Sequence, residues 1–567
     1  MKKILSLIIV LSLSISVITS CSFLSDYITF LGREARQLTD YSSITYERPD
    51  FVSLSSKIDT LKADLMLSEK EKYYYINLLS EIVSDFYYTA YTMESIAFLE
   101  YAKNIKNDTL REEYFYLVTE NEKISAKLDE LYYLCAASEY KAEMESSCLG
   151  VGFLDNYAGE EFTYPEEFSE LLEKENMLIN EYNAAMSELS VEYEGVTYTG
   201  ETIGVIPDDE LYDAVCRAYY DKYNSLLGNL YLELAGVRNT IAAYCGYTSY
   251  AEYSFDLYAR DYSIGDFDEY FSGIKEYIAP VYRDMSVKYK EEVMLSLPEA
   301  SPDEILGLGE SMVSLMSPKL EKIFTSMKLN HLYTVACSEE MYNGSFQIYF
   351  NEYETPYLFV NGTGFACDSL TLMHEFGHFA SAYYNYGNVG SNDEAEVASQ
   401  GLELLSLKYL DKIFDADTAE IIGKYELLNL ASAFTECAAY TEFENLVYGD
   451  DNLTVEKCNE YFQYCCDKYA LEGITGNKTS DGMYWVFINH LFEYPYYMIG
   501  YSVSADTSVQ LYEKCVDGID EYINFIQLAG NGDFFGSIER SGLESPFAAG
   551  RAEKTAAFLR RELEKYS

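Results

Sequence analysis

The sequence predicts a mainly helical protein with one small sheet, and two observations carry that prediction. In the segments 54–67, 70–99 and 111–136, apolar residues recur close to the 3.6-residue spacing of an amphipathic helix, with Lys and Glu between them. Only ten of the 567 residues are Pro, which suits long helices. Hydrophobic residues make up 49% of the chain, so a sizeable core can form without disulfide or metal staples.

The first twenty residues predict an export signal that is not part of the fold. Lys2 and Lys3 precede an apolar run at 4–18, which is too short to span a bilayer comfortably. Small residues follow and lead directly to Cys21, an arrangement that resembles the lipobox of bacterial lipoproteins. We therefore expect a cleaved signal peptide over 1–20, lipid on Cys21, and a protein anchored to the outer face of a bacterial membrane. An ordinary signal peptide with a chance Cys is the alternative.

The charge of the chain argues against one class of partner. The net charge is −54, and it becomes −56 once Lys2 and Lys3 leave with the leader. Phosphate groups would be repelled by such a chain, so we expect no nucleic acid partner. A well-solvated acidic surface is the simplest interpretation, and it could also attract cationic peptides or metal ions.

The cysteines do not form a recognisable disulfide pattern. Of 12 Cys in the chain, Cys21 is expected to carry lipid, which leaves an odd number. No CxxC pair occurs, and Cys465 and Cys466 are adjacent. We expect most of the others to be buried as small apolar residues.

Two breaks in the helical pattern suggest how the chain is divided. The segment 147–166, rich in Gly, Asp, Glu and aromatic residues, predicts a loop, and 189–204 alternates around Gly195 as a small hairpin does. Asp208 and Asp209 then predict a helix cap. We place a domain boundary here, with an N-terminal helical domain over residues 21–204 and a second domain over residues 205–567.

A strand-rich zone lies at 331–364 in the second domain. It contains the apolar runs 332–335, 346–350 and 357–360, separated by turn residues. These runs predict a small sheet directly before the most informative segment of the chain.

Residues 370–380 contain a His-Glu-x-x-His motif on a predicted helix. His374 and His378 are four residues apart and so lie on one helix face, where both imidazoles can bind one Zn²⁺. Glu375, next to the first of them, is placed to act as a general base toward water at the metal. The apolar residues around the motif would bury the rest of the helix.

Two His leave zinc short of one ligand, because a catalytic zinc usually has three protein ligands and one open position. The metzincin extension would require Gly at 381 and His at 384, where this chain has Ser381 and Tyr384. A carboxylate from a second helix is the remaining usual choice. The candidates downstream are Asp393, Glu394, Glu396 and Glu403.

Glu396 is the preferred third ligand. Residues 386–393 predict a turn, and a helix follows from about 394 to 409. Glu396 lies in the first turn of that helix and can face back across the motif helix, with Glu394 as the alternative. Glu403 is about two turns further on the same face, where it could accept a hydrogen bond from a ligand imidazole. A solvated helix face is the other interpretation of Glu403.

At these residues the chain resembles the oligoendopeptidase F family, which is related to thimet oligopeptidase. Residues 374–378 match the family's HExGH pattern and residues 396–399 its Glu-x-Ala-Ser pattern. Asp368, six residues before the first His, also fits, and we expect it to support the site from outside the ligand set. The resemblance covers roughly 205–550. Further segments that carry it are 260–262, 344–364 and 541–547.

The resemblance also implies that a His and several Tyr late in the chain line the cleft and stabilise the transition state. His490, Tyr497 and Tyr501 are the candidates, with Tyr494 as an alternative because the spacing varies within the family. Tyr497 and Tyr501 are four residues apart, so one helix face could present both hydroxyls.

The fold implied by the resemblance is a two-domain helical clamshell with a deep channel and the small sheet beside the zinc-binding helix. The implied function is that of a metalloendopeptidase with one Zn²⁺ per chain. It would hydrolyse internal bonds of short oligopeptides with zinc-activated water and Glu375 as the base. Two alternatives stay open, a non-catalytic peptide-binding lipoprotein and a dipeptidyl carboxypeptidase on the same fold.

Overall fold

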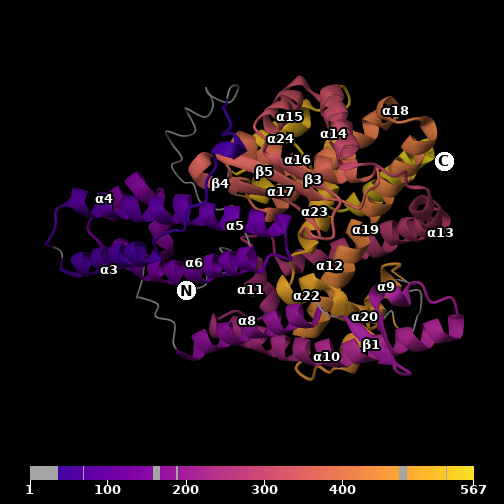
Figure 1. Ribbon diagram of the computed structural model, residues 1–567, viewed down its shortest axis with the longest axis horizontal. Coiled ribbons are helices and arrows are strands. Elements are labelled where there is room, and N and C mark those ends of the chain that lie inside the picture. The colour runs from indigo at the N-terminus through magenta and orange to yellow at the C-terminus, as the bar shows by residue number, and fades with distance from the viewer. Residues whose placement is uncertain are drawn as a thin grey trace.

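The N-terminal part of the molecule is a layer of long helices (Figure 1). In the computed structural model these are α3 (Phe51–Leu67), α4 (Lys72–Val83), α5 (Tyr91–Lys103) and α6 (Asp108–Ala137). The predicted helix at 70–99 is α4 and α5 joined through a π-helical turn at Ser84–Ala90. The apolar stripes of these helices meet in a core confined to residues 51–157.

The structure describes residues 36–67, 69–157, 166–186, 189–471, 480, 482–530 and 533–566. The expected signal peptide and Cys21 lie outside these residues. None of the helices in the described ranges is both long enough and apolar enough to cross a membrane.

The predicted hairpin and helix cap follow this layer. Helix α8 (Glu166–Met186) leads to the antiparallel strands β1 (Ser190–Tyr193) and β2 (Val196–Thr199), in which Val191 pairs with Tyr198. The Asp208 side chain then accepts a hydrogen bond from Leu211 N at 2.8 Å and caps the 36-residue helix α10 (Asp209–Tyr244). Both predictions for this region are confirmed.

The second part of the molecule holds a three-stranded sheet covered by helices. Strands β3 (Tyr333–Ala336), β5 (Thr355–Asn361) and β4 (Ser345–Phe350) lie side by side in that order, with β3 parallel and β4 antiparallel to β5. Helix α16 (Asp368–Asn385) packs against β5 and β4, and it also contacts α14 (Pro302–Met316). The sheet therefore lies beside the helix that carries the His-Glu-x-x-His motif, as the sequence predicts.

Helix α7 belongs to the N-terminal layer, and the other remaining helices surround α16 and the sheet or extend below them in Figure 1. Their bounds are α7 Lys141–Met144, α9 Gly200–Ile203, α11 Tyr250–Leu257, α12 Phe267–Gly273, α13 Ala279–Ser296, α15 Pro318–Leu329, α17 Asn392–Ser406, α18 Leu410–Ile413, α19 Ala416–Tyr448, α20 Val455–Lys468, α22 Asn489–Glu493, α23 Ile499–Lys514, α24 Asp520–Leu528, α25 Phe534–Arg540 and α26 Arg551–Leu563.

A large hydrophobic core connects α16 and the sheet with helices from both ends of the chain. It includes side chains of α8, where Tyr182 stacks on Phe492 with ring centroids 3.9 Å apart. Helix α8 thus shares a core with residues far beyond it in sequence. The proposed boundary between residues 204 and 205 stays a prediction.

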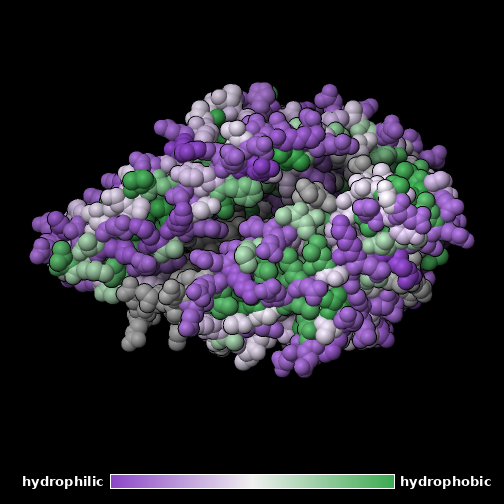
Figure 2. Space-filling model, turned by 60° about the horizontal axis from the view of Figure 1, so that its bottom comes forward, coloured by the Kyte–Doolittle hydropathy of each residue, from purple (hydrophilic) through white to green (hydrophobic). Residues whose placement is uncertain are grey.

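The cysteines and the surface agree with the composition. None of the eleven cysteines in the described residues is in a disulfide, and most of them are buried, as expected of small apolar side chains. Figure 2 shows that hydrophilic residues cover much of one face of the molecule, and that this face is hollowed near its middle.

Candidate metal centre

Helices α16 and α17 approach each other closely, and a glycine permits the approach. A Cβ atom added to Gly377 would lie 2.3 Å from the carbonyl oxygen of Ala398 and 2.8 Å from Cα of Ser399. The gap between the two helices at this point leaves no room for a side chain. The backbones therefore meet here, and the polar faces of the two helices are brought together.

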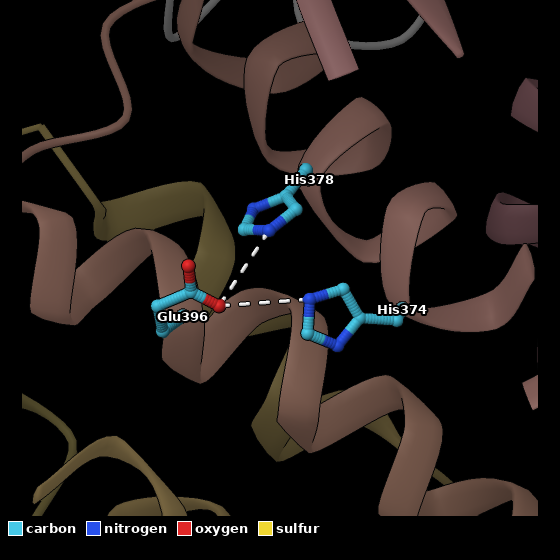
Figure 3. Close-up of side chains that lie close together, drawn as sticks. All are labelled: His374, His378 and Glu396. Atoms are coloured by element: carbon cyan, nitrogen blue, oxygen red, sulfur yellow. Dashed lines mark ion pairs between the residues drawn. The ribbon is translucent and has the colours of Figure 1, made fainter. Parts of the chain in front are cut away.

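This contact gathers the two histidines of the motif and the preferred third ligand (Figure 3). His374 Nε2 lies 3.6 Å from Glu396 Oε2, and His378 Nε2 lies 3.7 Å from the same oxygen. The oxygen also accepts a hydrogen bond from Ser399 Oγ at 2.9 Å, which fixes the carboxylate.

The arrangement fits a metal ion. Two atoms bound tetrahedrally to Zn²⁺ at about 2.1 Å are separated by roughly 3.4 Å, close to the nitrogen–oxygen distances seen here. The three ligand atoms lie within 4.8 Å of one another. Two imidazoles and one carboxylate are a donor set that catalytic zinc sites use, with the fourth position open.

Glu403 holds the first histidine from the side opposite the ligand atom. Its Oε2 lies 2.9 Å from His374 Nδ1, so Nδ1 carries a proton, and Nε2 is the ring nitrogen on the side of Glu396 and the candidate metal position. Burial by itself lowers the pKa of His374, but Glu403, Glu375 and Glu396 together raise it to about 10. The site therefore favours a positive charge at its centre.

A buried acid that the sequence analysis missed extends this chain of contacts. Glu426 on α19 is buried and hydrogen-bonds to Glu403, and its pKa is raised well above the ordinary value by burial and by the charge of Glu403. A protonated Glu426 can donate to Glu403 and hold it against His374. The available signal was an acidic residue inside the apolar stretch that forms α19, but its partner lies 23 residues earlier in another helix.

Glu375 lies next to the three candidate ligands and lines the same cavity, which is described below. It is only 6% exposed, and its Oε2 has no hydrogen-bond partner among the described residues. Burial, together with the charges of Glu396 and Glu403, raises the pKa of Glu375 to about 8 despite the opposing charge of His374. In its ionised form, this buried carboxylate with an unused oxygen can accept a proton from a bound reactant.

A cavity of about 370 Å³ opens over these residues. One wall is strand β4, from Ser345 to Tyr349, and another is formed by Tyr497 and Tyr501. Strand β4 is an edge strand of the sheet, so its outer main-chain groups face away from β5.

The two tyrosines face the metal site from a loop and from the helix after it. Tyr497 precedes α23 and Tyr501 lies in its first turn, so they do not share one helix face. Their rings are nevertheless neighbours, with centroids 5.5 Å apart, and their hydroxyls hydrogen-bond. Burial raises the pKa of both phenols, so both keep their protons.

A buried arginine that the sequence analysis did not place in the site holds this loop. Arg260 donates to the main-chain oxygens of Tyr496 at 2.7 Å and Tyr497 at 3.2 Å. Its guanidinium lies 3.6 Å from Asp393, which Tyr262 also contacts. The segment 260–262 resembles the family, and in the structure it positions the tyrosines.

Three other predicted residues lie further from the ligands. Among the described residues that line the metal cavity, His490 does not occur. Its ring lies against Tyr497 and Tyr494, with ring centroids 6.0 and 6.1 Å away. Glu394 is occupied in a capping box, accepting from Ser391 N at 3.0 Å, which also explains why α17 begins at Asn392 rather than at 394.

Asp368 does not touch the histidines. It accepts hydrogen bonds from Thr363 Oγ1 at 2.9 Å and from Gly364 N at 2.7 Å. Six residues of helix separate it from His374, a rise of about 9 Å. It therefore fixes the loop that leads into α16, and any support that it gives to the ligands acts through the placement of this helix.

Comparisons with known proteins agree with this geometry. Residues 327–535 match the model of peptidase family M3. The chain is 27% identical to oligopeptidase PepF of Bacillus subtilis (strain 168) over 290 residues, which is 48% of this chain and 41% of that protein. The aligned part thus spans less than half of the curated relative. These matches support the resemblance to oligoendopeptidase F and a metallopeptidase.

Solved structures support the fold along nearly the whole chain. PZ peptidase A with an inhibitor superposes with a TM-score of 0.76 at 20% identity, over 93% of this chain and all of that one. A putative oligoendopeptidase F from Bacillus anthracis str. Ames has a TM-score of 0.70 at 20% identity, over 93% of this chain and 99% of the other. The predicted fold class, mainly helical with a small sheet beside the motif helix, is confirmed.

Proposed function

We propose that the chain is a zinc-dependent endopeptidase of the M3 type that hydrolyses short oligopeptides. One observation carries the proposal: His374, His378 and Glu396 converge on a single point at the base of a cavity that Glu375 also lines. A peptide-binding protein without catalysis would have no need for a buried, unpaired carboxylate at this position. The match to peptidase family M3 over residues 327–535 supports the same proposal.

The residues divide the chemistry between them. Glu375 takes a proton from the attacking water and passes it to the leaving amine, because this residue lines the cavity and its Oε2 has no hydrogen-bond partner among the described residues. Tyr497 or Tyr501 donates a hydrogen bond to the oxygen of the peptide carbonyl as negative charge develops there. The chemistry that bound Zn²⁺ supplies is Lewis acidity toward water and toward that carbonyl.

Two features support short, extended peptides as substrates. The cavity is small and is walled by an edge strand, and an extended peptide can add to such a strand through main-chain hydrogen bonds. A folded protein cannot present an isolated strand in this way.

The test uses the purified mature chain and peptides of graded length. Zinc content is measured by mass spectrometry, and cleavage is followed with and without a chelator. We expect one zinc per chain and cleavage of short peptides that stops with chelation, returns with zinc, and falls as peptide length grows. The fragments also distinguish internal cleavage from release of carboxy-terminal dipeptides.

Two outcomes would redirect the proposal. Bound zinc without any cleavage would favour the alternative, a non-catalytic peptide-binding lipoprotein. A chain that binds no zinc would overturn the metal centre itself.

We also propose that the protein is a lipoprotein on the outer face of the bacterial cell membrane, attached through Cys21. The sequence of the leader supports this proposal. Metabolic labelling with a tagged fatty acid should mark the wild-type chain and leave Cys21→Ala unmarked. Equal labelling of the two would contradict it.

A further inference from the structure

A second cavity, which we call the Glu94 cavity, lies beside the metal cavity. Its volume is about 420 Å³, within the range of ligand sites, and residues of α5, α6, α8, α10, α11 and the loop after α22 line it. Figure 1 shows α8 and α11 beside the end of the α5–α6 layer. Tyr494 lines this cavity and Tyr497 lines the metal cavity, and their ring centroids are 6.3 Å apart.

The Glu94 cavity has more carboxylates than cations. Four glutamates and one arginine line it: Glu94, Glu122, Glu175, Glu493 and Arg238. Arg238 is already engaged, because its Nε lies 2.7 Å from Glu175 and its Nη1 donates to the main-chain oxygen of Leu491 at 3.2 Å. Within the described residues, the other three carboxyl groups form no ion pair, so no cation of the cavity wall balances them.

A buried amide oxygen adds to this surplus of acceptors. Asn121, only 2% exposed, donates from Nδ2 to Glu94 at 2.6 Å. Its Oδ1 has no donor among the described residues. A buried acceptor without a donor costs free energy, which a ligand with several N–H groups would recover. Burial without a facing cation raises the pKa of Glu94 to about 7.

We propose that the Glu94 cavity binds the cationic side chain of an Arg or Lys residue in the peptide substrate. A guanidinium presents five N–H donors in a plane and an ammonium presents three, which matches a cavity of carboxylate and amide oxygens. Tyrosine rings at its walls, among them Tyr91 and Tyr114, can contact such a cation through their faces. The inference rests on the proposed peptidase function and names its substrate class, peptides with a basic residue.

Adjacent rings in the walls of the two cavities limit where this residue can lie. The ring centroids of Tyr494 in the Glu94 cavity and Tyr497 in the metal cavity are 6.3 Å apart, and an extended peptide advances about 3.3 Å per residue. The basic residue should therefore lie within a few positions of the bond that is cut, on one side of it only.

The test compares N-acetylated, C-amidated fluorogenic peptides that differ at one position. Arginine is placed in turn at each of four positions on either side of the cleaved bond, and each peptide is paired with one carrying citrulline, which has the same shape without the charge. We expect kcat/KM to favour arginine over citrulline by about tenfold or more at one position. Glu94→Gln should lower that ratio severalfold, chiefly by slowing cleavage of the arginine peptide.

Two controls separate this cavity from general charge effects. Glu112→Gln, an exposed position on the same helix as Asn121, should keep the full arginine preference. A peptide with a free amino terminus and no basic side chain should gain nothing over its acetylated form.

Three results would overturn the proposal: equal cleavage of arginine and citrulline peptides at all positions, a preference unchanged in Glu94→Gln, or a preference for the free amino terminus instead. If no peptide is cleaved at all, the proposed peptidase function fails. The inference can then still be tested by binding alone, with fluorescence anisotropy of labelled arginine and citrulline peptides on the Glu375→Gln variant. Equal affinity of this variant for the two peptides would contradict the inference.

Discussion

Buried carboxyl groups occur in two regions of the molecule, and their surroundings differ. At the metal centre Glu396 and Glu403 face the nitrogens of His374, at 3.6 and 2.9 Å. In the N-terminal helix layer, Asp129 accepts from the hydroxyl of Tyr157 at 3.0 Å and Glu94 from an amide, and no cation faces either within the described chain. Burial raises the pKa of both Asp129 and Glu94 to about 7. Buried carboxyl groups that face imidazole nitrogens can share a metal ion with them, whereas Asp129 and Glu94 face no cation in the described part of the chain and take up protons near neutral pH.

The largest effect should come from the unpaired carboxylate of the metal centre. Glu375→Gln should lower kcat about a thousandfold, because the amide cannot accept the proton from water, while metal content stays at the wild-type level. Glu94→Gln, the matched change in the other region, should leave the cleavage of uncharged peptides intact. Steady-state kinetics and metal analysis of both variants provide the check. Wild-type rates in Glu375→Gln would contradict the role given to it.

The helix contact can be tested next. Gly377→Ala should push α16 away from α17, because the new Cβ would lie 2.3 Å from the carbonyl oxygen of Ala398. We expect a loss of about 1–3 kcal/mol in stability together with weaker zinc binding. Gly236→Ala on α10 is the control, because a Cβ there meets nothing within 4 Å. Equal behaviour of the two variants in thermal melts and zinc titrations would show that the contact does not position the ligands.

A smaller effect is expected from the residue behind the first histidine. Glu403→Gln should weaken zinc binding by about 10–100-fold, because the ring of His374 loses its charged acceptor. Glu426→Gln should change zinc affinity much less, since its carboxyl group is already neutral. Competition with a chromogenic chelator measures both affinities. Zinc binding in Glu403→Gln as tight as in the wild type would argue against the positioning role.

The smallest effect concerns the N-terminal layer and depends on pH. The pKa of Asp129 in the folded chain is about 7, above the ordinary value of 3.8, so the folded state holds a proton that the unfolded state releases. Its contribution to stability is complete below pH 3.8 and is lost as the pH rises through about 7. Between pH 5 and pH 8 the Tm should therefore fall further for the wild type than for Asp129→Asn, by about 2 °C.

The exposed Glu112→Gln variant, on the same helix, should follow the wild type across this pH range. Parallel Tm curves for the wild type and Asp129→Asn would show that Asp129 does not carry the buried proton.

The features that were predicted correctly from the sequence are those that depend on the spacing of nearby residues. The i, i+4 relation places His374 and His378 on one face of a helix, and alternation around Gly195 predicts the hairpin. Glu394 stayed open as an alternative to Glu396 for the third ligand, because the turn between the two helices sets which side chain faces back. The capping box that occupies Glu394 is itself a local pattern, Ser391 followed three residues later by Glu, and it would have narrowed the choice.

The rest depends on contacts between distant segments. Arg260 reaches the loop at Tyr496 across 236 residues of chain, and Glu426 meets Glu403 from a separate helix. The residue pattern of neither segment indicates which distant residue it contacts. The Glu94 cavity is assembled from several helices in the same way, which is why the sequence indicates only an acidic chain and not where that charge is enclosed.

Strand β4 determines which properties of a peptide the metal cavity can distinguish. An edge strand offers main-chain donors and acceptors, and every residue except proline can complete that pattern. Peptides aligned on it would be held in one orientation regardless of their side chains. The strand would therefore accept peptides of many sequences and exclude those with a proline at a paired position, in both cases because it contacts only main-chain groups. Discrimination between peptides would then depend on the side-chain cavities beyond the strand.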